Sequence, residues 1–210
     1  MVVVRYLGRA CVEIISDNDH IVIDPNFVEL PRKGVNKILL SHEHDDHLSN
    51  EDILKIYEKY ARENKQLKIF GPKSTKEKVA FEKLYVVKAG TVIDLKDGKI
   101  DVYSIDCWGA DSCLAYLVNI DGKRILHTAD SANYSDRLRN IEKAVDCCFV
   151  ACFEDYYDNY LHFVKTILPK LAVPYHFGPD EMQMGENLVE YFKKNYLKVE
   201  LYNPGEEISI

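Results

Sequence analysis

Short apolar runs that end in turn residues dominate the first forty positions of the chain. Gly8 and the polar triplet at 17–19 separate the first three of these runs, as in strands joined by tight turns. Pro25 ends the third run, because proline disfavours helical backbone at Asp24 before it. The fourth run is apolar without alternation, which is typical of a strand covered on both faces. These strands are predicted at 2–6, 11–15, 21–23 and 35–40.

Helical and strand patterns alternate through the rest of the chain. Ser49 can cap a helix that extends to about Tyr60, because Asp52 follows three positions later and apolar residues recur at helical spacing. Asp-Gly pairs at 97–98 and 121–122 separate short apolar runs and predict an antiparallel meander from position 84 onward. Further strands are predicted at 67–70, 84–87, 91–95, 99–105, 114–119, 124–127, 145–150, 171–173, 199–202 and 208–210, and further helices at 74–81, 135–143, 159–168 and 181–195.

This order of elements predicts the α/β class, with two mixed β-sheets stacked face to face and helices on the outer faces. The chain has 210 residues, of which 47% are apolar, enough to fill the core of such a sandwich. No internal repeat is visible, and no Pro-, Gly- or Ser-rich linker divides the sequence. We therefore expect a single domain over 1–210.

Composition and charge exclude several classes of protein. The formal net charge is −7 and no basic cluster is present, so we expect no binding to nucleic acid. No stretch approaches the roughly 20 apolar residues of a membrane span. The N-terminus has the pattern of a strand rather than of an export signal, so we expect a cytoplasmic protein. The cysteines lack CxxC pairs and are expected to be reduced thiols; they are Cys11, Cys107, Cys113, Cys147, Cys148 and Cys152.

The segment 41–47, Ser-His-Glu-His-Asp-Asp-His, concentrates potential metal ligands at the exit of the buried strand at 35–40. His42 and His44 are two positions apart, so in extended backbone they point to the same side. Asp46 and His47 follow where the chain turns and can face a second point nearby. This spacing suits two ions, and imidazole with carboxylate favours zinc, iron or manganese over calcium or magnesium.

Polar residues at other strand ends are candidates to complete this site. Asp130 and His176 each follow an apolar run directly, and strand ends meet at one rim where loops cluster. Asp24 has two interpretations, which the sequence leaves open: a turn-forming residue, or an acceptor that orients a ligating imidazole.

The motif His42-x-His44-x-Asp46-His47 resembles the signature of the metallo-β-lactamase superfamily. Asp24, Asp130 and His176 recur in the order expected for that family, and 4–14 is similar to the start of its small, hydrolase-like branch. That branch includes relatives of sugar-phosphate lactonases and of N-acyl-phospholipid phosphodiesterases. The resemblance implies an αββα sandwich with a dinuclear site on one edge. By the same resemblance, His42 and His44 would hold the first metal, Asp46, His47 and His176 the second, and Asp130 would bridge the two.

One expected ligand is missing, because no histidine lies between His47 and His127, where the family supplies a third His to the first metal. Asp106 lies at the matching place, and we expect it to substitute in preference to Cys107, since a carboxylate at the sheet edge is the smaller chemical change. A weak or empty first site is the third alternative.

A dinuclear site of this kind implies a metal-dependent hydrolase. Metal-bound hydroxide would attack a small-molecule ester, lactone or phosphodiester, with Asp46 and Asp130 as the catalytic carboxylates. The expected cofactor is zinc, one or two ions per chain, with manganese or iron as alternatives. The missing histidine leaves a second hypothesis open, a metal-binding sensor or scaffold without turnover. A homo-oligomer also remains open, since small enzymes commonly form symmetric assemblies.

Overall fold

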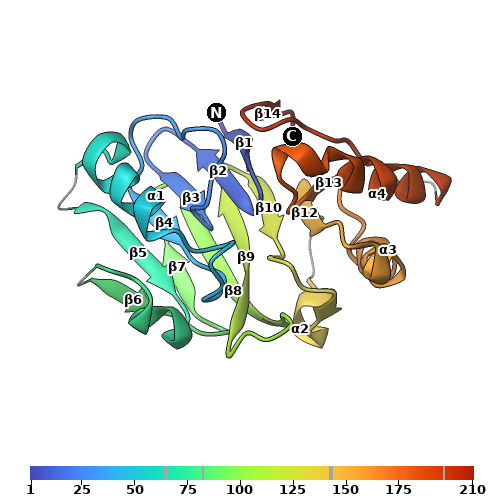
Figure 1. Cartoon of the computed structure of the whole chain (residues 1–210), viewed down its shortest axis with the longest axis horizontal. Helices are drawn as coiled ribbons and strands as arrows, with labels where there is room; N and C mark the ends of the chain where they lie inside the picture. Colours follow the sequence, from blue (N-terminus) through green and yellow to red (C-terminus); the bar gives the residue numbers. More distant parts are fainter. Residues whose placement is uncertain (64–65, 82, 142–143, 196) are drawn as a thin grey trace.

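The first of two β-sheets is built mainly from the N-terminal part of the chain (Figure 1). The computed structural model describes residues 1–63, 66–81, 83–141, 144–195 and 197–210. Pairing is antiparallel between the first three strands and parallel from β3 to β6. In spatial order the strands are β14 (Glu207–Ile208), β1 (Val3–Gly8), β2 (Cys11–Ile15), β3 (His20–Ile23), β4 (Lys37–Leu39), β5 (Lys68–Gly71) and β6 (Leu84–Val86).

The second sheet is also mixed. Its centre is the antiparallel meander that the Asp-Gly turns predicted, and its far side is parallel. In spatial order the strands are β11 (Asn133–Tyr134), β8 (Gly98–Asp106), β9 (Cys113–Ile120), β10 (Lys123–His127), β12 (Cys147–Ala151) and β13 (Leu171–Tyr175), and β7 (Val92–Asp94) also pairs with β8.

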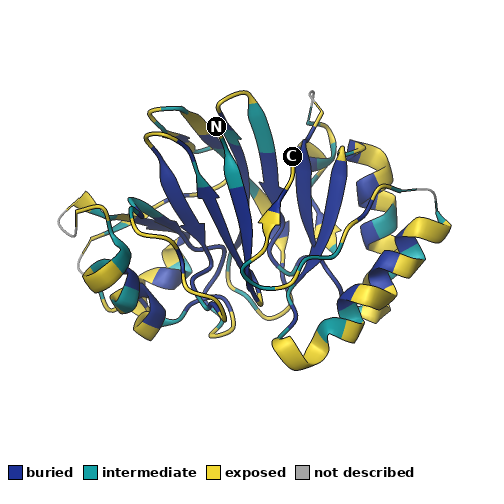
Figure 2. Cartoon of the chain, turned by 90° about the horizontal axis from the view of Figure 1, so that it is seen from above, coloured by how far each residue is buried: buried dark blue, intermediate teal, exposed yellow. Residues whose placement is uncertain are grey.

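Helices cover the outer faces of the two sheets, and Figure 2 shows the buried strands between helices whose outer sides are exposed. The predicted αββα sandwich is therefore confirmed. On one side lie α1 (Asn50–Lys55), its continuation as the π-helix η1 (Ile56–Tyr60), and the 3-10 turn η3 (Lys73–Glu77). On the other side lie α2 (Asp136–Arg139), η4 (Glu154–Tyr156), α3 (Tyr157–Ile167), η5 (Pro179–Glu181) and α4 (Met182–Lys194).

Strand alternation divides the apolar side chains of the first sheet between two cores. Tyr6 points into the core between the sheets, where it shares a cluster with Tyr116 of the second sheet. Its neighbour Leu7 points outward and packs in a separate cluster with Ile53 of α1. The cap of α1 is the predicted one, because the Ser49 side chain accepts a hydrogen bond from the Asp52 amide.

Several predicted elements differ from the structure. The run at 84–87 leaves the meander and joins the first sheet, because β6 pairs in parallel with β5. The run at 199–202 makes only one isolated bridge, from Val199 to Ala172, because the chain then turns towards β1, where the Gly205 amide donates to the Tyr6 carbonyl. The helix predicted at 74–81 is the shorter η3. The helix predicted at 135–143 ends at Arg139, and its last two positions lie outside the described residues.

The expectation of six reduced cysteines is wrong for one pair, because Cys107 and Cys113 form a disulfide. The antiparallel hairpin of β8 and β9 pairs Ile105 with Cys113, which brings Cys107 beside Cys113 just beyond the paired strands. The remaining four cysteines are buried free thiols. Within the described residues, no helix is long and apolar enough to cross a membrane.

Candidate metal centre

The predicted ligand loop leaves β4 and folds back on itself in a tight turn. The backbone amides of His47 and Leu48 donate to the His44 carbonyl at 3.0 and 2.9 Å. The Asn26 side chain donates to the Asp45 carbonyl at 2.8 Å, which ties this turn to the loop that follows β3. The turn therefore presents both halves of the motif to the same rim of the sandwich.

Side chains from five separate parts of the chain converge at this rim. They form three groups, and within each group the potential ligand atoms lie within 4.8 Å of one another. His42 and Asp46 each belong to two groups, so the three groups form one continuous cluster. The groups are His42, His44 and Asp46; Asp46, His47 and His176; and His42, Cys107, Cys113 and Asp130.

A buried carboxylate beneath the cluster fixes the orientation of His47. Asp24 accepts hydrogen bonds from the amide and the hydroxyl of Ser41 at 2.7 and 2.6 Å, and it lies 2.8 Å from Nδ1 of His47. With Nδ1 held by this carboxylate, Nε2 of His47 points into the cluster, where it lies 2.9 Å from Nε2 of His176. This is the contact expected of a residue that orients a ligating imidazole.

Asp24 and His47 shift one another's pKa in opposite directions. Burial alone would raise the pKa of Asp24, but His47, together with the nearby His127 and His42, lowers it below its ordinary value. Burial alone would lower the pKa of His47, but the Asp24, Asp130 and Asp46 carboxylates together raise it above its ordinary value. The two groups therefore form a buried ion pair when His47 carries a proton.

His42 and Asp46 are held in the protonation states that metal binding needs. Burial, reinforced by the neighbouring His47, lowers the pKa of His42 to about 4, so its imidazole is neutral at pH 7. The hydrogen bond with His176 lowers the pKa of Asp46 well below its usual range, so this side chain is a carboxylate. A neutral imidazole and an ionised carboxylate are the ligating forms of these residues.

Two buried polar atoms in the cluster have no hydrogen-bond partner among the described residues. They are Nε2 of His42 and Oδ1 of Asp130, and they lie 3.8 Å apart. Leaving a buried polar atom without a partner costs about 1–3 kcal/mol, so such atoms call for a specific explanation. A cation between the two atoms would satisfy both, and the donor set of the cluster therefore fits a metal ion.

The backbone is left-handed at three strand ends that form the rim. Asp24, Ala129 and His176 have φ of 49°, 47° and 68°. A non-glycine residue in this region costs about 1–3 kcal/mol and persists only where its surroundings hold it. The Tyr175 hydroxyl donates to the Ala129 carbonyl at 2.6 Å, and the His176 amide donates to the Arg9 carbonyl at 2.8 Å. These turns direct the side chains of the rim towards the cluster.

The structure does not bring every candidate into the cluster. Asp106 is exposed and accepts a hydrogen bond from the Asn133 side chain at 2.8 Å, outside the three groups, whereas its neighbour Cys107 belongs to one of them. Cys113 was missed as a site residue. The sequence did carry a signal for Cys113: it comes directly before the predicted strand at 114–119, and that strand pairs with the strand that ends just before Cys107. His127 belongs to none of the three groups; its buried ring lies beside Asp24, with Nε2 at 3.0 Å from the Ala10 carbonyl and 3.8 Å from the Asp24 carboxylate.

Two small cavities flank the cluster. One, of about 270 Å³, lies beside Asp46 and His176, and its walls include Arg9 and the apolar side chains of Phe153 and Met184. The other, of about 220 Å³, lies beside Asp130 and Cys107, with the exposed Trp108 and Tyr156 at its edge. Both are open to solvent at the rim, so a small molecule placed in either one contacts potential ligands.

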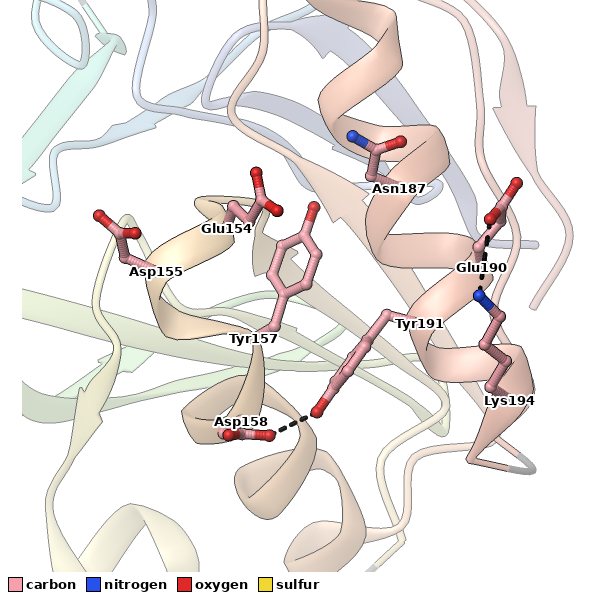
Figure 3. A pocket seen from close by; sticks show the side chains of 8 residues that line it. All are labelled: Glu154, Asp155, Tyr157, Asp158, Asn187, Glu190, Tyr191 and Lys194. Carbon is pink, nitrogen blue, oxygen red and sulfur yellow. Dashed lines mark hydrogen bonds and ion pairs between the residues drawn. The ribbon is translucent and has the colours of Figure 1, made fainter.

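A wider hollow, of about 550 Å³, lies between α3 and α4 (Figure 3). In this hollow the Tyr191 hydroxyl donates to Asp158, and Lys194 lies 3.9 Å from Glu190. None of the residues that the sequence predicted for the site lines it. The potential metal ligands are therefore at the rim of the sheets and not in the larger hollow.

Sequence comparisons relate most of the chain to one family. The sequence profile described as the β-lactamase superfamily domain matches residues 3–176, a span that ends at His176 and so includes every predicted ligand. A UPF0173 protein of Pyrococcus abyssi is 29% identical, with 82% of each chain covered, and a UPF0173 metal-dependent hydrolase of Thermus thermophilus is 24% identical, with 100% of each covered.

Solved structures show the same fold at low sequence identity. The metallo-β-lactamase fold protein YhfI of Bacillus subtilis superposes with a TM-score of 0.81 at 17% identity, with 100% of both chains covered. Igni18, a metallo hydrolase of the archaeon Ignicoccus hospitalis, superposes with a TM-score of 0.71 at 18% identity, covering 99% of this chain and 97% of its own.

Proposed function

The chain belongs to the metallo-β-lactamase superfamily, and from this premise we propose that it is a metal-dependent hydrolase of small molecules. The observation that carries the proposal is the convergence of imidazoles and carboxylates from distant parts of the chain on one rim. Two relatives named metal-dependent hydrolases, matched over 89% and 100% of their own length, give it further support.

The geometry supports two neighbouring metal positions within the cluster. His42 and His44 would hold the first ion, and Asp46, His47 and His176 the second. Asp130 is suited to bridge them, because Oδ1 lies 3.8 Å from Nε2 of His42 and Oδ2 lies 3.9 Å from Nε2 of His47. Imidazole and carboxylate ligands favour zinc, with manganese or iron as alternatives.

The chain's own residues prepare the site for hydrolysis. When bound, the ions supply an activated water and a Lewis acid for the substrate oxygen. Asp24 holds His47 in one tautomer, and the low pKa of His42 keeps that ring neutral at pH 7, with one ring nitrogen able to bind a metal. Asp46 and Asp130 are the proposed catalytic carboxylates, since Asp46 belongs to two of the groups and Asp130 shares a third group with His42.

The two flanking cavities support a small ester, lactone or phosphodiester as the substrate. Volumes of about 270 and 220 Å³ are at or below the low end of the usual range for drug-sized ligands. The guanidinium of Arg9 beside His176 provides a cation for an anionic substrate group, and Phe153 provides an apolar surface for the rest of the molecule.

Alanine variants of the ligand set test the proposal. We expect His44→Ala and Asp130→Ala to lose bound metal, measured by elemental analysis, together with hydrolysis across a panel of esters, lactones and phosphodiesters. His162→Ala is the matched control, because this histidine is exposed on α3 and belongs to none of the groups. Full metal content and full activity in either ligand variant would overturn the proposal.

One observation favours a second candidate, a metal-binding sensor or scaffold without turnover. The family's third histidine is missing here; Asp106, at the matching place, lies outside the three groups, and its neighbour Cys107 is held in a disulfide, which leaves the first group short of a ligand. Two tightly bound ions with turnover on the panel would favour the enzyme. One ion, with no turnover on any ester or phosphodiester, would favour the binding protein.

A further inference from the structure

We propose that Cys107 and Cys113 are a redox-controlled ligand pair for the first metal position, available as thiolates when reduced and withdrawn when they form their disulfide. This inference rests on the metal centre proposed above and deepens it. It supplies the ligand that the missing histidine leaves open, and it makes occupancy of the first position depend on the oxidation state of the chain.

The two sulfur atoms lie inside the cluster and not merely near it. Together with His42 and Asp130 they form a group whose potential ligand atoms lie within 4.8 Å of one another. Sγ of Cys113 is 3.5 Å from Nδ1 of His42. Both cysteines are buried, at 8% and 5% exposure, so they face the interior of the site.

Unpartnered atoms in the same group point to an ion as the missing occupant. Nε2 of His42 and Oδ1 of Asp130 have no hydrogen-bond partner among the described residues, and His42 is fully buried. Two thiolates would add sulfur ligands to the imidazoles and the bridging carboxylate already proposed for the first position, and zinc binds all three kinds of ligand. A disulfide has no thiolate to offer, and the thiolate is the form of cysteine that binds metals.

The fold holds both cysteines at the site independently of the bond between them. The hairpin of β8 and β9 positions them, and its loop is tied to the histidine motif by two further hydrogen bonds. The Asp111 amide donates to the Glu43 side chain at 2.7 Å, and the Leu114 amide donates to the Ser41 carbonyl at 3.0 Å. Reduction therefore leaves two thiols beside His42 instead of releasing the loop.

The chemistry of the switch balances with a dithiol as reductant. The dithiol delivers two electrons and two protons, the sulfur–sulfur bond of the protein breaks, and the dithiol leaves as its own disulfide. A divalent ion then replaces the two thiol protons, which pass to solvent. Cys107 lines the open cavity of about 220 Å³ beside Trp108, which gives the reductant a route to the bond.

Cobalt binding to the full chain in two oxidation states tests the inference. Metal-stripped protein is divided into an oxidised sample and a sample reduced with dithiothreitol, which is then removed without air. Cobalt(II) takes the same ligands as zinc and shows a thiolate-to-cobalt charge-transfer band in the near ultraviolet. We expect this band only in the reduced sample, with affinity at the first position at least about tenfold higher than in the oxidised sample.

Serine variants identify the sulfur atoms responsible. The double variant C107S/C113S should lose the band and bind cobalt equally under both conditions. Cys148→Ala, which removes a buried thiol in β12 outside the cluster, should keep the band. Circular dichroism checks that the variants fold, and the comparison of the two wild-type samples requires no variant at all.

The outcomes separate this inference from the proposed function. If the reduced wild-type chain binds two cobalt ions without the band, or the double variant keeps the band, the cysteine ligands are refuted while the metal centre stands. If the chain binds no cobalt in either state, both proposals are refuted.

Discussion

Removing the Asp24 carboxylate should destabilise the fold and weaken metal binding at the same time. Asp24 is fully buried and is the acceptor for the Ser41 amide and the Ser41 hydroxyl, and it also contacts Nδ1 of His47. Asp24→Ala leaves the Ser41 amide without its acceptor and His47 without its carboxylate, while the Ser41 hydroxyl keeps its contact with Nδ1 of His42 at 2.9 Å. His47 then loses the contact that fixes its tautomer and its orientation towards His176.

The expected size of the effect follows from these contacts. Each buried group left unsatisfied costs about 1–3 kcal/mol, and breaking a buried charge pair costs about 3–5 kcal/mol. Because one side chain provides all three contacts, the terms overlap. We therefore expect the free energy of unfolding of the metal-free protein to fall by about 3–5 kcal/mol. Loss of a group that orients a metal ligand lowers metal affinity by about 10–100-fold.

The stabilisation by Asp24 has a defined pH dependence. Its pKa in the folded protein lies below the ordinary value, so the charged form stabilises the fold. This contribution to the free energy of unfolding is fully present above about pH 3.9, the pKa of aspartate in the unfolded chain. It is lost as the pH falls through the lower pKa that Asp24 has in the folded protein. Urea unfolding should therefore show the full difference between the wild type and Asp24→Ala at pH 7 and a smaller one in strong acid.

Two further variants separate orientation of His47 from simple loss of stability. Asp19 is also fully buried, and it pairs with Lys37, away from the cluster. Asp19→Ala should lower stability without changing zinc affinity, measured by competition with a chelator. Asp24→Asn keeps the shape of the side chain but not its charge, and should lose zinc affinity with a smaller loss of stability. Equal zinc affinity in Asp24→Ala and Asp19→Ala would refute this reasoning.

Other predictions test the site and its support. The pKa of His47 is raised in the metal-free chain, so its charged form stabilises the fold below about pH 6.5 and loses that effect as the pH rises through the folded pKa. An NMR titration of the metal-free chain that gave His47 a pKa at or below 6.5 would contradict this prediction. Because zinc competes with the His47 proton, we also expect the affinity for zinc to fall as the pH is lowered. Tyr116→Phe removes a buried hydroxyl that donates at 2.6 Å to a carbonyl just after β4, and should cost about 1–2 kcal/mol in urea unfolding with metal content unchanged. Gly8→Ala places a Cβ 2.6 Å from the Val28 side chain at φ +97°, and should lower the melting temperature; an unchanged melting temperature would show that the turn adapts.

Sequence patterns predicted the fold well where the pattern within a segment also determines which neighbours the segment packs against. Ile38 and Leu39 of the apolar run at 35–40 face two different cores, as predicted for a strand covered on both faces. The Asp-Gly pairs gave the meander because a two-residue turn forces neighbouring strands to pair. The run at 84–87 carried no signal for its partner strand, and only tertiary packing places it beside β5.

The same contrast explains what the sequence revealed about the site. The spacing of His42, His44 and His47 is local, so the motif can be recognised from consecutive residues alone. The contribution of Cys113 depends on the register between β8 and β9, which aligns it with Ile105 and so with the end of the opposite strand. Asp106 and Cys107 are adjacent and, on alternation, face opposite sides. The choice between them therefore depended on a register that the sequence did not define.

The most direct test of the metal centre is a crystal structure of the reduced full chain, purified without added metal, with ions placed by anomalous scattering and identified by elemental analysis. We expect one ion bound by His42 and His44, joined in this reduced state by the thiolates of Cys107 and Cys113, and a second bound by Asp46, His47 and His176, with Asp130 between them. A chain that contains no stoichiometric metal, or whose ions lie away from these side chains, would contradict this expectation.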